Sequence, residues 1–323
     1  MPKKYISRVK QGKSFRYSVA GETVDTATLS RIASLAVPPA WTDVQIAISS
    51  TSKVQATGID ASGRKQYIYS KAHMARQEAA KFDRITSFAE KLPKLRKQVQ
   101  KDLKRWRFDK RKVAAAAVSL LDQEYFRVGN HSYARSNKTY GLTTLRSKHL
   151  TVKRGQAIFD FVGKSGQKHH KVVTDEQIAR IVKKLDAMPG YELFRYYDKQ
   201  GKLHNLTSSD VNDYIKHVMG GDYSAKDFRT WGGTLVAAVE LSRETRPDTK
   251  TARKKAMNDC IKRVAKKLGN TPAIAKSSYI DLRVFKAYES KGGILAVHET
   301  VKNMRPPKYV SKDEALAMKV LGS

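Results

Sequence analysis

The order of apolar and polar residues divides the chain into two parts with different periodicities. In about the first 76 residues, apolar and polar side chains alternate in short runs such as Phe15–Val19 and Val44–Ile48, separated by glycine-containing turns. A period of two is typical of β-strands that bury one face. Val37–Trp41 contains two adjacent prolines and predicts the end of a short helix and the start of an extended stretch. We therefore expect residues 1–76 to form a small β-rich domain.

Beyond residue 76 the pattern becomes helical. The alanine-rich run Val113–Phe126 predicts a helix, for which Gly129 is a suitable stop. A second helix from about Thr251 should end before Gly269, and Thr271 followed by Pro272 predicts the start of another helix, which carries Tyr279. Capping-box patterns, in which a hydroxyl residue is followed three positions later by an acid or amide, predict further helix starts at Thr174–Gln177, Ser224–Asp227 and Ser311–Glu314.

A small sheet interrupts this helical part. Three short runs with strand-like alternation follow one another closely, separated by turns of which the second is Gly163–Gln167: Leu150–Val152, Ala157–Val162 and Lys168–Val173. The predicted fold class is α+β. We expect a β-rich N-terminal domain (residues 1–76) and a larger, mainly helical domain (residues 77–323) that contains a small three-stranded antiparallel sheet.

The charge of the chain points to a polyanionic partner. Its 63 Lys and Arg residues exceed its 30 Asp and Glu residues, which gives a formal net charge of +33. Such an excess repels itself in the compact state and so does not help folding. It is explained by binding to a nucleic acid, although a very soluble basic protein without a particular partner is an alternative.

Several classes of function are disfavoured by missing residues. Gly163–Ser165 resembles the end of a phosphate-binding loop, but Ile158 stands where that loop needs a glycine, and no Gly-x-Gly-x-x-Gly follows a strand. ATP and dinucleotide cofactors are therefore not expected. With one cysteine, Cys260, neither an intrachain disulfide nor a structural zinc site is expected. The adjacent His169 and His170 should point to opposite faces of a strand, and we interpret both as surface residues.

Neither a signal peptide nor a membrane span is predicted, because the N-terminus and the rest of the chain lack long apolar runs. The sequence is that expected of a soluble protein that is not secreted.

Two segments are candidates for contact with nucleic acid. Residues 91–112 hold eleven basic side chains with Trp106 and Phe108 among them, a composition typical either of a solvated helix face or of a surface that follows a phosphate backbone. In the N-terminal part, cations and hydroxyls surround Gln66, whose amide can pair with adenine; these candidates are Arg64, Lys65, Gln66, Tyr67 and Tyr69. Strand alternation places Tyr67 and Tyr69 on one face, where a cross-strand tyrosine pair is an equally good interpretation.

Seven segments, in order, resemble the type IB DNA topoisomerases of the compact poxviral and bacterial kind. The likeness spans about residues 37–281 and is carried by Val37–Val44, Gly63–Tyr69, Phe126–Gly129, Tyr140–Leu145, Phe161–Lys164, Lys226–Thr230 and Leu268–Pro272, the last leading to Tyr279–Ile280. The resemblance implies an enzyme that relaxes duplex DNA through a 3′-phosphotyrosyl intermediate, without ATP or metal. It also implies a monomer clamped around the duplex, in a bacterial cytoplasm or encoded by a virus.

By the same resemblance, the active site falls on Arg127, Lys164, Arg229, Asn270 and Tyr279, with Asn130 and Tyr133 as further DNA-binding candidates. The poxviral enzymes have histidine at the position of Asn270, whereas bacterial relatives commonly have asparagine there. The chemistry suits these residue types. Guanidinium groups and an amide can hold the non-bridging oxygens of a phosphodiester, tyrosine can act as a nucleophile, and lysine can protonate the departing 5′-oxygen. No side chain in the sequence is identified as the base for Tyr279, whose ordinary pKa is about 10.

Two alternatives remain open at this point. A tyrosine recombinase uses nearly the same residues, but its second arginine usually follows a His-x-Leu segment, and this chain has Lys226–Phe228 before Arg229. A DNA-binding protein that has lost the chemistry is the second alternative, against which all five candidate positions hold suitable residue types.

Overall fold

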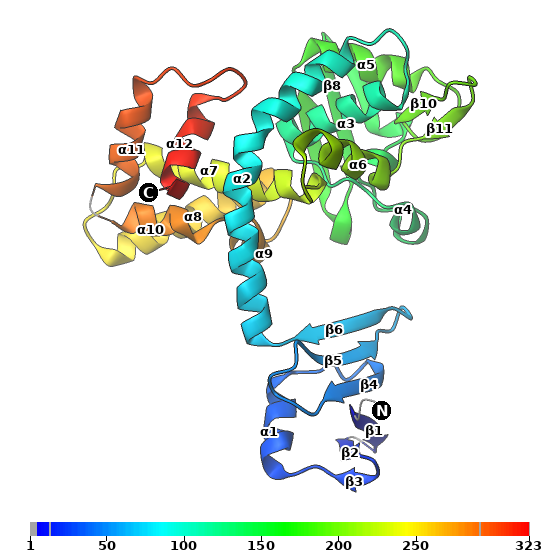
Figure 1. The fold of residues 1–323 in the computed structure, drawn as a ribbon, viewed down its shortest axis with the longest axis vertical. Helices are drawn as coiled ribbons and strands as arrows, with labels where there is room; N and C mark the ends of the chain where they lie inside the picture. The colour runs from blue at the N-terminus through cyan, green and yellow to red at the C-terminus, as the bar shows by residue number, and fades with distance from the viewer. Residues whose placement is uncertain (1–4, 13, 291, 323) are drawn as a thin grey trace. The chain divides into compact units, whose positions relative to one another are not determined.

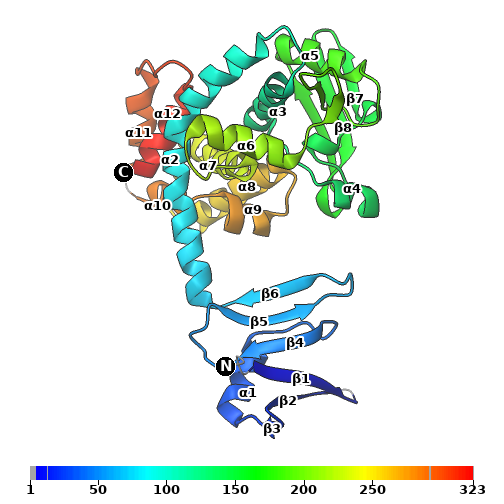
Figure 2. The same ribbon diagram turned by 45° about the vertical axis from the view of Figure 1, so that its right-hand side comes forward.

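The chain forms two compact units, Met1–Asp83 and Arg84–Ser323, in a computed structural model that describes residues 5–12, 14–290 and 292–322. The side chains of five residues inside helices also lie outside the described part: Glu78, Ala79, Lys81, Ser132 and Tyr133. Figure 1 and Figure 2 show the elements of each unit. The boundary between the units falls inside the long helix α2 (Lys71–Leu103).

The first unit is a six-stranded antiparallel sheet with one helix. The strands run in the order β3-β2-β1-β4-β5-β6, and α1 (Thr26–Ser34) contributes Ile32 to the core. Ile6, Val44, Ile46 and Ala56 complete that core, as the alternation in the sequence requires. The strand bounds are β1 Tyr5–Gln11, β2 Ser14–Val19, β3 Glu22–Thr23, β4 Thr42–Ala47, β5 Val54–Ile59 and β6 Lys65–Tyr69. The predicted β-rich N-terminal part is confirmed.

The second unit is mainly helical. Its other helices are α3 Lys110–Glu124, α4 His131–Asn137, α5 Glu176–Asp186, α6 Ser208–Met219, α7 Ala225–Arg243, α8 Lys250–Leu268, α9 Pro272–Tyr279, α10 Leu282–Glu289, α11 Gly293–Lys302 and α12 Lys312–Gly322. The buried run Val113–Val118 places α3 at the centre of its core.

Two sheets belong to the second unit. The predicted three-stranded sheet is confirmed, with β7 Leu150–Lys153, β8 Gln156–Val162 and β9 Lys168–Val173 in that order. A hairpin of β10 (Arg195–Tyr197) and β11 (Leu203–Asn205) was not predicted from the sequence. The overall fold class, a β-rich N-terminal part followed by a helical part with a small sheet, is as expected.

The predicted helix boundaries are partly right. The capping boxes at Ser224–Asp227 and Ser311–Glu314 are present, and Thr271 accepts the backbone N–H of Ile274 at the start of α9. Two predictions were wrong. The capping box predicted to begin at Thr174 does not form: the N-cap of α5 is the next residue, Asp175, whose carboxylate accepts the N–H of Ile178.

The other error is the stop assigned to Gly129. Helix α3 ends at Glu124, because Tyr125 adopts a left-handed conformation with φ of 54°. A tyrosine in this conformation needs support from its surroundings, since its Cβ disfavours it. The support comes from α7, where Gly232 leaves room for the ring: a Cβ at that glycine would lie 2.4 Å from Tyr125 Cε1.

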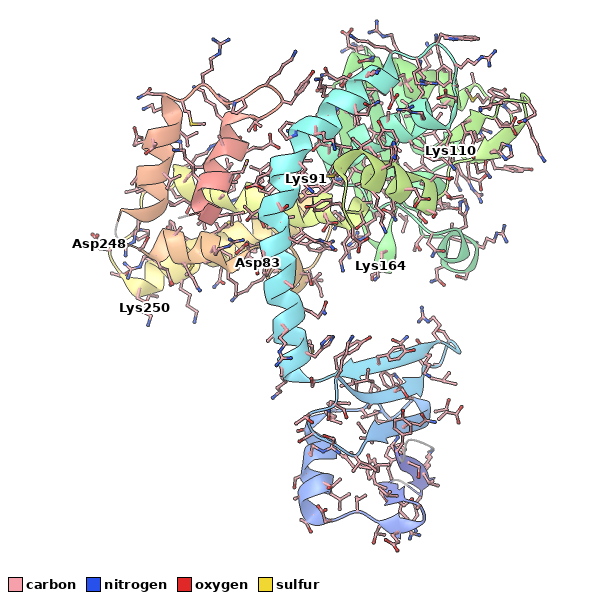
Figure 3. The ribbon with its side chains drawn as sticks, in the orientation of Figure 1. Asp83, Lys91, Lys110, Lys164, Asp248 and Lys250 are labelled. Atoms are coloured by element: carbon pink, nitrogen blue, oxygen red, sulfur yellow. The ribbon has the colours of Figure 1, made fainter. Side chains whose placement is uncertain are left out.

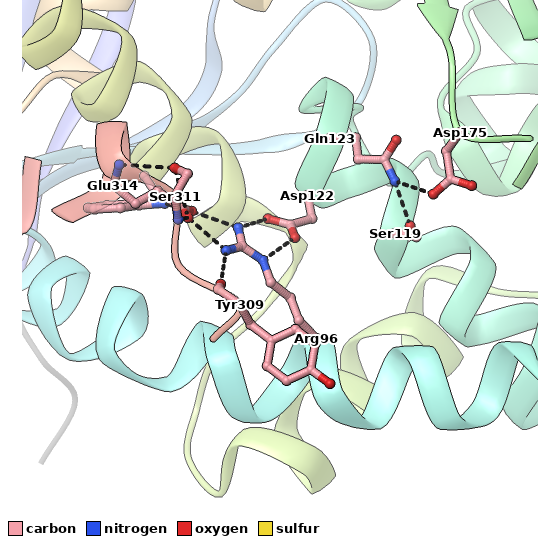
Figure 4. A network of polar contacts seen from close by, with 9 residues as sticks. Arg96, Ser119, Asp122, Gln123, Asp175, Tyr309, Ser311 and Glu314 are labelled. Atoms are coloured by element: carbon pink, nitrogen blue, oxygen red, sulfur yellow. Dashed lines mark hydrogen bonds and ion pairs between the residues drawn. The ribbon is translucent and has the colours of Figure 1, made fainter. Parts of the chain in front are cut away.

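A partly buried ionic network fixes the C-terminal helix α12 in the second unit (Figure 4). Arg96 on α2 donates to both carboxylate oxygens of Asp122 on α3, at 2.6 and 2.8 Å, and to those of Glu314 on α12, at 2.8 and 2.6 Å. Glu314 also accepts from the indole N–H of Trp231 on α7, at 3.4 Å. Charged hydrogen bonds of this kind are stronger than neutral ones. The last residues of the chain are thereby attached to α7, the helix that carries Arg229.

Candidate active site

Four of the five candidate catalytic residues converge in the second unit. Arg127 follows the end of α3, Arg229 lies in the first half of α7, Asn270 lies between α8 and α9, and Tyr279 is the last residue of α9. Lys164, the fifth, lies at the turn between β8 and β9. The convergence is produced by helix packing, because α7 contacts α8, α9 and α3.

Arg229 is held by the carbonyl ends of two helices. Only 3% of the residue is exposed, and its two terminal nitrogens donate to Tyr125 O at 2.6 Å and Leu268 O at 2.9 Å. These carbonyls stand at the C-terminal ends of α3 and α8, where the backbone carries partial negative charge. Burial lowers the pKa of Arg229, and the neighbouring Tyr279 opposes that shift. The helix ends therefore stabilise a buried cation without neutralising it.

Arg127 lies close enough to Arg229 for the two charges to repel each other. It donates to Gly269 O at 3.4 and 3.3 Å and to the side-chain oxygen of Asn270. Burial and the charge of Arg229 lower the pKa of Arg127 to about 10. Within the described residues neither arginine has a carboxylate partner, so the pair forms a site of uncompensated positive charge. Such a site suits a phosphate group.

Asn270 presents an unused hydrogen-bond donor. Its Oδ1 accepts from Arg127, which fixes the orientation of the amide, and its Nδ2 is buried without a partner among the described residues. A buried donor without a partner costs free energy and is uncommon in folded proteins. A ligand oxygen bound between Arg127 and Asn270 would satisfy it.

Tyr279 is seated on α7 and next to Arg229. The guanidinium carbon of Arg229 lies 4.9 Å from the centroid of the Tyr279 ring. The backbone of Tyr279 rests against Gly233, where a Cβ would lie 2.5 Å from Tyr279 O, and Thr234 Oγ1 donates to that same oxygen at 3.3 Å. The position of the tyrosine is thus set by the helix that also carries Arg229.

The pKa of Tyr279 is lowered from its ordinary value of 10. Burial opposes ionisation of the phenol, but the charge and hydrogen bond of Arg229 and the charges of Arg127 and Lys226 outweigh that effect. Positive charge close to a phenol favours the phenolate. The sequence identified no base for this tyrosine; in the structure, the surrounding cations favour its ionised form.

Lys164 is not assembled with the other four. It is exposed in a short 3-10 turn, residues 164–166, at the tip of the β8–β9 hairpin (Figure 3). It makes no hydrogen bond or ion pair with the other candidate residues in the described part of the chain.

The structure corrects one interpretation and reveals two further residues at the site. His169 was interpreted as a surface residue; it is half-buried, stacked on Phe161 with ring centroids 4.9 Å apart. Lys171, two residues along the same strand face, is 5% exposed and donates to Glu124 O at 2.6 Å. Both residues line a small cavity together with Arg127 and Arg229. Alternation with buried Val173 along β9 was the sequence signal for this face.

His170 faces the other way, as predicted. Its side chain is 66% exposed and its Nδ1 lies 2.7 Å from Asp160 Oδ1.

The DNA-binding candidates of the first unit lie on and beside β6, the edge strand of its sheet. Tyr67 and Tyr69 stack with centroids 6.1 Å apart on an exposed face, and Lys65 Nζ lies 5.8 Å from the Tyr67 ring centroid. Gln66 points to the other face and donates to Asp60 at 2.8 Å, and Arg64 also binds Asp60, at 3.0 Å. The structure therefore groups Lys65, Tyr67 and Tyr69 and separates Gln66 from them.

The remaining candidates lie in the second unit. Asn130 is exposed and its carbonyl accepts the N–H of Ala134 in the first turn of α4. The side chain of Tyr133 lies outside the described residues. In the basic run 91–112, several cations are engaged by acids, as with Arg96 and Asp122, Arg105 and Asp109, and Lys110 and Asp210. This run is therefore divided between structural ion pairs and exposed lysines.

No group of three or more His, Cys, Asp or Glu side chains suited to a metal ion occurs in residues 5–12, 14–290 and 292–322. In the same ranges, no helix has the length and apolar character needed to cross a membrane.

Comparison with known proteins places this geometry in a family. A family model described as the catalytic core of eukaryotic DNA topoisomerase I matches residues 62–304, and one described as the N-terminal domain of bacterial DNA topoisomerase IB matches residues 14–60. The chain is 34% identical over 303 residues to DNA topoisomerase 1B of Acanthamoeba polyphaga mimivirus, covering 91% of this chain and 90% of that protein. It is 26% identical over 248 residues to DNA topoisomerase 1B of vaccinia virus (strain Copenhagen), covering 75% of each.

These matches define the class of the protein as DNA topoisomerase. The chain belongs to the type IB DNA topoisomerase family. This assignment favours the topoisomerase over the recombinase and over the non-catalytic DNA-binding protein.

Proposed function

We propose that the protein relaxes supercoiled duplex DNA by cutting one strand with Tyr279, letting the duplex rotate, and resealing the strand. The observation that carries this proposal is the seating of Tyr279 against Arg229, beside Arg127 and the unpartnered amide of Asn270. The family assignment supports DNA as the substrate.

The chemistry is an exchange of phosphoesters. The phenolate oxygen of Tyr279 attacks phosphorus, the bond between phosphorus and the 5′-oxygen breaks, and the 5′-oxygen takes a proton. The product is a 3′-phosphotyrosyl link and a 5′-hydroxyl. Resealing is the reverse step, in which the 5′-hydroxyl loses its proton and the phenolate leaves. The ester link is conserved throughout, so the cycle requires neither ATP nor a metal ion.

Each candidate side chain has a distinct role in this exchange. Arg127 and Arg229 hold the non-bridging oxygens as negative charge develops on them, in a buried site where such interactions are strong. The Nδ2 of Asn270 donates to one of these oxygens, which gives the buried amide its missing partner. Lys164 donates the proton to the departing 5′-oxygen after the hairpin tip approaches the DNA.

The lowered pKa of Tyr279 supports its role as the nucleophile. The two arginines that stabilise the transition state also stabilise the phenolate, so a dedicated base is not required for activation. The negative charge of the bound phosphodiester will oppose ionisation of Tyr279. The two arginines must therefore stabilise both the phenolate and the phosphate.

We also propose that residues 1–76 form a DNA-clamp domain, that residues 77–323 form the catalytic domain, and that the protein acts as a monomer. The exposed group of Lys65, Tyr67 and Tyr69 on β6 supports DNA contact by the first domain. A cation and two hydroxyls can bind phosphates and the edges of bases. A substrate of this kind implies action where duplex DNA is found, in the cytoplasm of a bacterium or in a cell infected by a virus.

The test is relaxation of a negatively supercoiled plasmid in buffer with a chelator and without ATP. The wild-type protein should relax the plasmid and leave a 3′-linked protein adduct when the reaction is stopped with detergent. Tyr279→Phe keeps the ring against Arg229 but removes the hydroxyl, and it should bind DNA while forming no adduct. Exchange between specific sites without relaxation would support a recombinase, and binding without cleavage would support a non-catalytic protein; either result would overturn the proposal.

A further inference from the structure

His169 occupies the space between two glycines that precede candidate catalytic residues. A Cβ at Gly163 would lie 2.7 Å from Cδ2 and Nε2 of the His169 ring, and a Cβ at Gly269 would lie 2.1 Å from its Cε1. Gly163 stands directly before Lys164, and Gly269 directly before Asn270. Contacts this short leave no room for a side chain at either position. One ring thus touches the backbone of both segments.

The ring is held in this place from a third side. His169 on β9 is the register partner of Phe161 on β8, and the two rings stack at 4.9 Å with an interplanar angle of 20°. The His169 ring makes no hydrogen bond to the described residues, so its influence on its neighbours comes from packing.

The two glycine segments have separate tasks. Gly163 N–H donates to Gln167 O at 2.8 Å and closes the base of the hairpin that carries Lys164. Gly269 O accepts from Arg127, and the next residue, Asn270, accepts from the same arginine. A ring wedged between these segments sets the distance from the base of the hairpin to the pair of Arg127 and Asn270.

His169 is uncharged at neutral pH. Burial and the positive charges of Lys171, Arg127 and Arg229 lower its pKa to about 4. A histidine in this state has no readily released proton to give to a leaving group near neutral pH, which argues against a role as the general acid. A neutral planar ring also avoids adding a third charge beside two arginines.

We propose that His169 is a positioning residue that aligns the Lys164 hairpin with the phosphate site formed by Arg127 and Asn270. The inference rests on the proposed role of Lys164 as the proton donor. Its physical basis is that the hairpin tip is exposed, whereas its base is fixed against the His169 ring. Removal of the ring would leave a gap at the base and let the tip take up other positions.

The proposal is tested by changing the leaving group. Cleavage by purified full-length variants is measured in single turnover on a duplex with an ordinary phosphodiester, and on the same duplex with sulfur in place of the bridging 5′-oxygen. A thiolate leaves without a proton, so the sulfur substrate bypasses any defect in proton donation. A defect at the non-bridging oxygens is not bypassed.

His169→Ala should slow cleavage of ordinary DNA by about 10²-fold, the effect expected when a catalytic group is misplaced by about 1 Å. On the sulfur substrate it should recover most of the wild-type rate, as Lys164→Ala should. Arg127→Ala should recover much less. His169→Phe keeps an aromatic ring stacked on Phe161, without the nitrogens and somewhat larger, and should cleave ordinary DNA faster than His169→Ala.

Two further variants control for damage to the fold. His170→Ala removes the neighbouring histidine on the opposite, exposed face and should cleave both substrates normally. Gly163→Ala inserts a methyl against the ring from the hairpin side at an ordinary backbone conformation, φ −96°, and should reproduce the sulfur-rescued defect. This second variant decides the question if His169→Ala does not fold.

The outcomes separate this inference from the proposed function. If Lys164→Ala recovers on sulfur but His169→Ala and Gly163→Ala do not, the role of Lys164 stands and the positioning role of His169 is wrong. Normal cleavage of ordinary DNA by folded His169→Ala would also overturn it. If Lys164→Ala itself fails to recover, the proposed proton donor is wrong.

Discussion

The guanidinium of Arg229 lies over the ring of Tyr279, with 4.9 Å between the guanidinium carbon and the ring centroid. The arginine is fixed by two carbonyls at the ends of α3 and α8, and the tyrosine backbone rests on Gly233, one turn further along the helix that carries the arginine. In the proposed mechanism, this arrangement would let one arginine act on both the Tyr279 phenol and the phosphate.

Cleavage should therefore gain rate with pH through a midpoint below the ordinary tyrosine value of 10. A lowered pKa means that the phenolate fraction at a given pH is larger than for an unperturbed tyrosine. Arg229→Gln removes the positive charge that lowers the pKa of Tyr279 most. The midpoint of the cleavage rate should therefore move to higher pH. Single-turnover cleavage of the sulfur substrate across pH measures this midpoint without interference from the proton donor. An unchanged midpoint in Arg229→Gln would show that the charge of Arg229 does not act on Tyr279.

Arg127→Ala should slow single-turnover cleavage by about 10²–10³-fold, the typical cost of losing one donor to developing charge. DNA affinity should change little, because one arginine is a small fraction of the phosphate contacts of a chain with a net charge of +33. Arg180→Ala, which removes an exposed arginine on α5, is the matched control for charge. An Arg127→Ala variant that cleaves like Arg180→Ala would remove Arg127 from the active site.

The activity of variants at Asn270 should depend on whether the new side chain can replace the hydrogen-bond donor Nδ2. Asn270→His can still donate to a phosphate oxygen and should keep substantial activity, whereas Asn270→Ala should lose more. Asn270→Asp has nearly the same shape, but its carboxylate would pair with Arg127 and repel the phosphate, so it should be the least active of the three. Cleavage rates under single turnover give the order, and an Asp variant more active than the Ala variant would contradict the assigned donor.

Glu314→Ala should lower the free energy of unfolding by about 2–3 kcal/mol, because hydrogen bonds to charged groups contribute about that much. Glu314 is 5% exposed, and its removal leaves Arg96 with Asp122 as its acidic partner. Asp313→Ala, on the same helix and exposed, should stay within about 0.5 kcal/mol of wild type. Urea unfolding measures both.

The pH dependence of this stabilisation follows from the direction of the shift. Burial raises the pKa of Glu314, but the hydrogen bond and charge of Arg96 lower it by more, to below the ordinary value of 4.5. Glu314 therefore stabilises the fold fully at pH values above 4.5, the ordinary pKa of a glutamate. This stabilisation is lost as the pH falls through the lower pKa that Glu314 has in the folded state. The difference in the free energy of unfolding between wild type and Glu314→Ala should therefore become smaller in acid. A difference that does not change with pH would contradict the ion pair between Glu314 and Arg96.

Affinity for nonspecific duplex should fall steeply with salt, by about 0.9 log units per phosphate contact for each log unit of salt. If Lys65 on β6 contacts the DNA backbone, Lys65→Ala should reduce the slope by about the amount expected for one phosphate contact. Lys53→Ala removes an exposed lysine of the same unit and serves as the control. Equal slopes for Lys65→Ala and Lys53→Ala would remove Lys65 from the DNA surface.

Local signals in the sequence determined much of the fold. Ser224 with Asp227 and Ser311 with Glu314 form their reciprocal caps within four residues, so their geometry depends little on the rest of the chain. The strands of the small sheet could also be predicted, because alternation of apolar and polar residues over about six positions indicates which face of a strand is buried. The ordered motifs also identified Arg127, Arg229, Asn270 and Tyr279 as candidates for one site, and the structure brings these four together.

Only the tertiary structure decided how these residues interact. Tyr125 ends α3 in a left-handed conformation because Gly232, more than a hundred residues away, makes room for its ring. His169 is half-buried because Gly163 and Gly269 close on it from two different elements. The carbonyls that hold Arg229, and the missing partner of Asn270, depend on how α3, α7 and α8 meet. Periodicity along the chain records which side of an element is buried, whereas contacts between distant segments are fixed by packing in three dimensions, which no local pattern encodes.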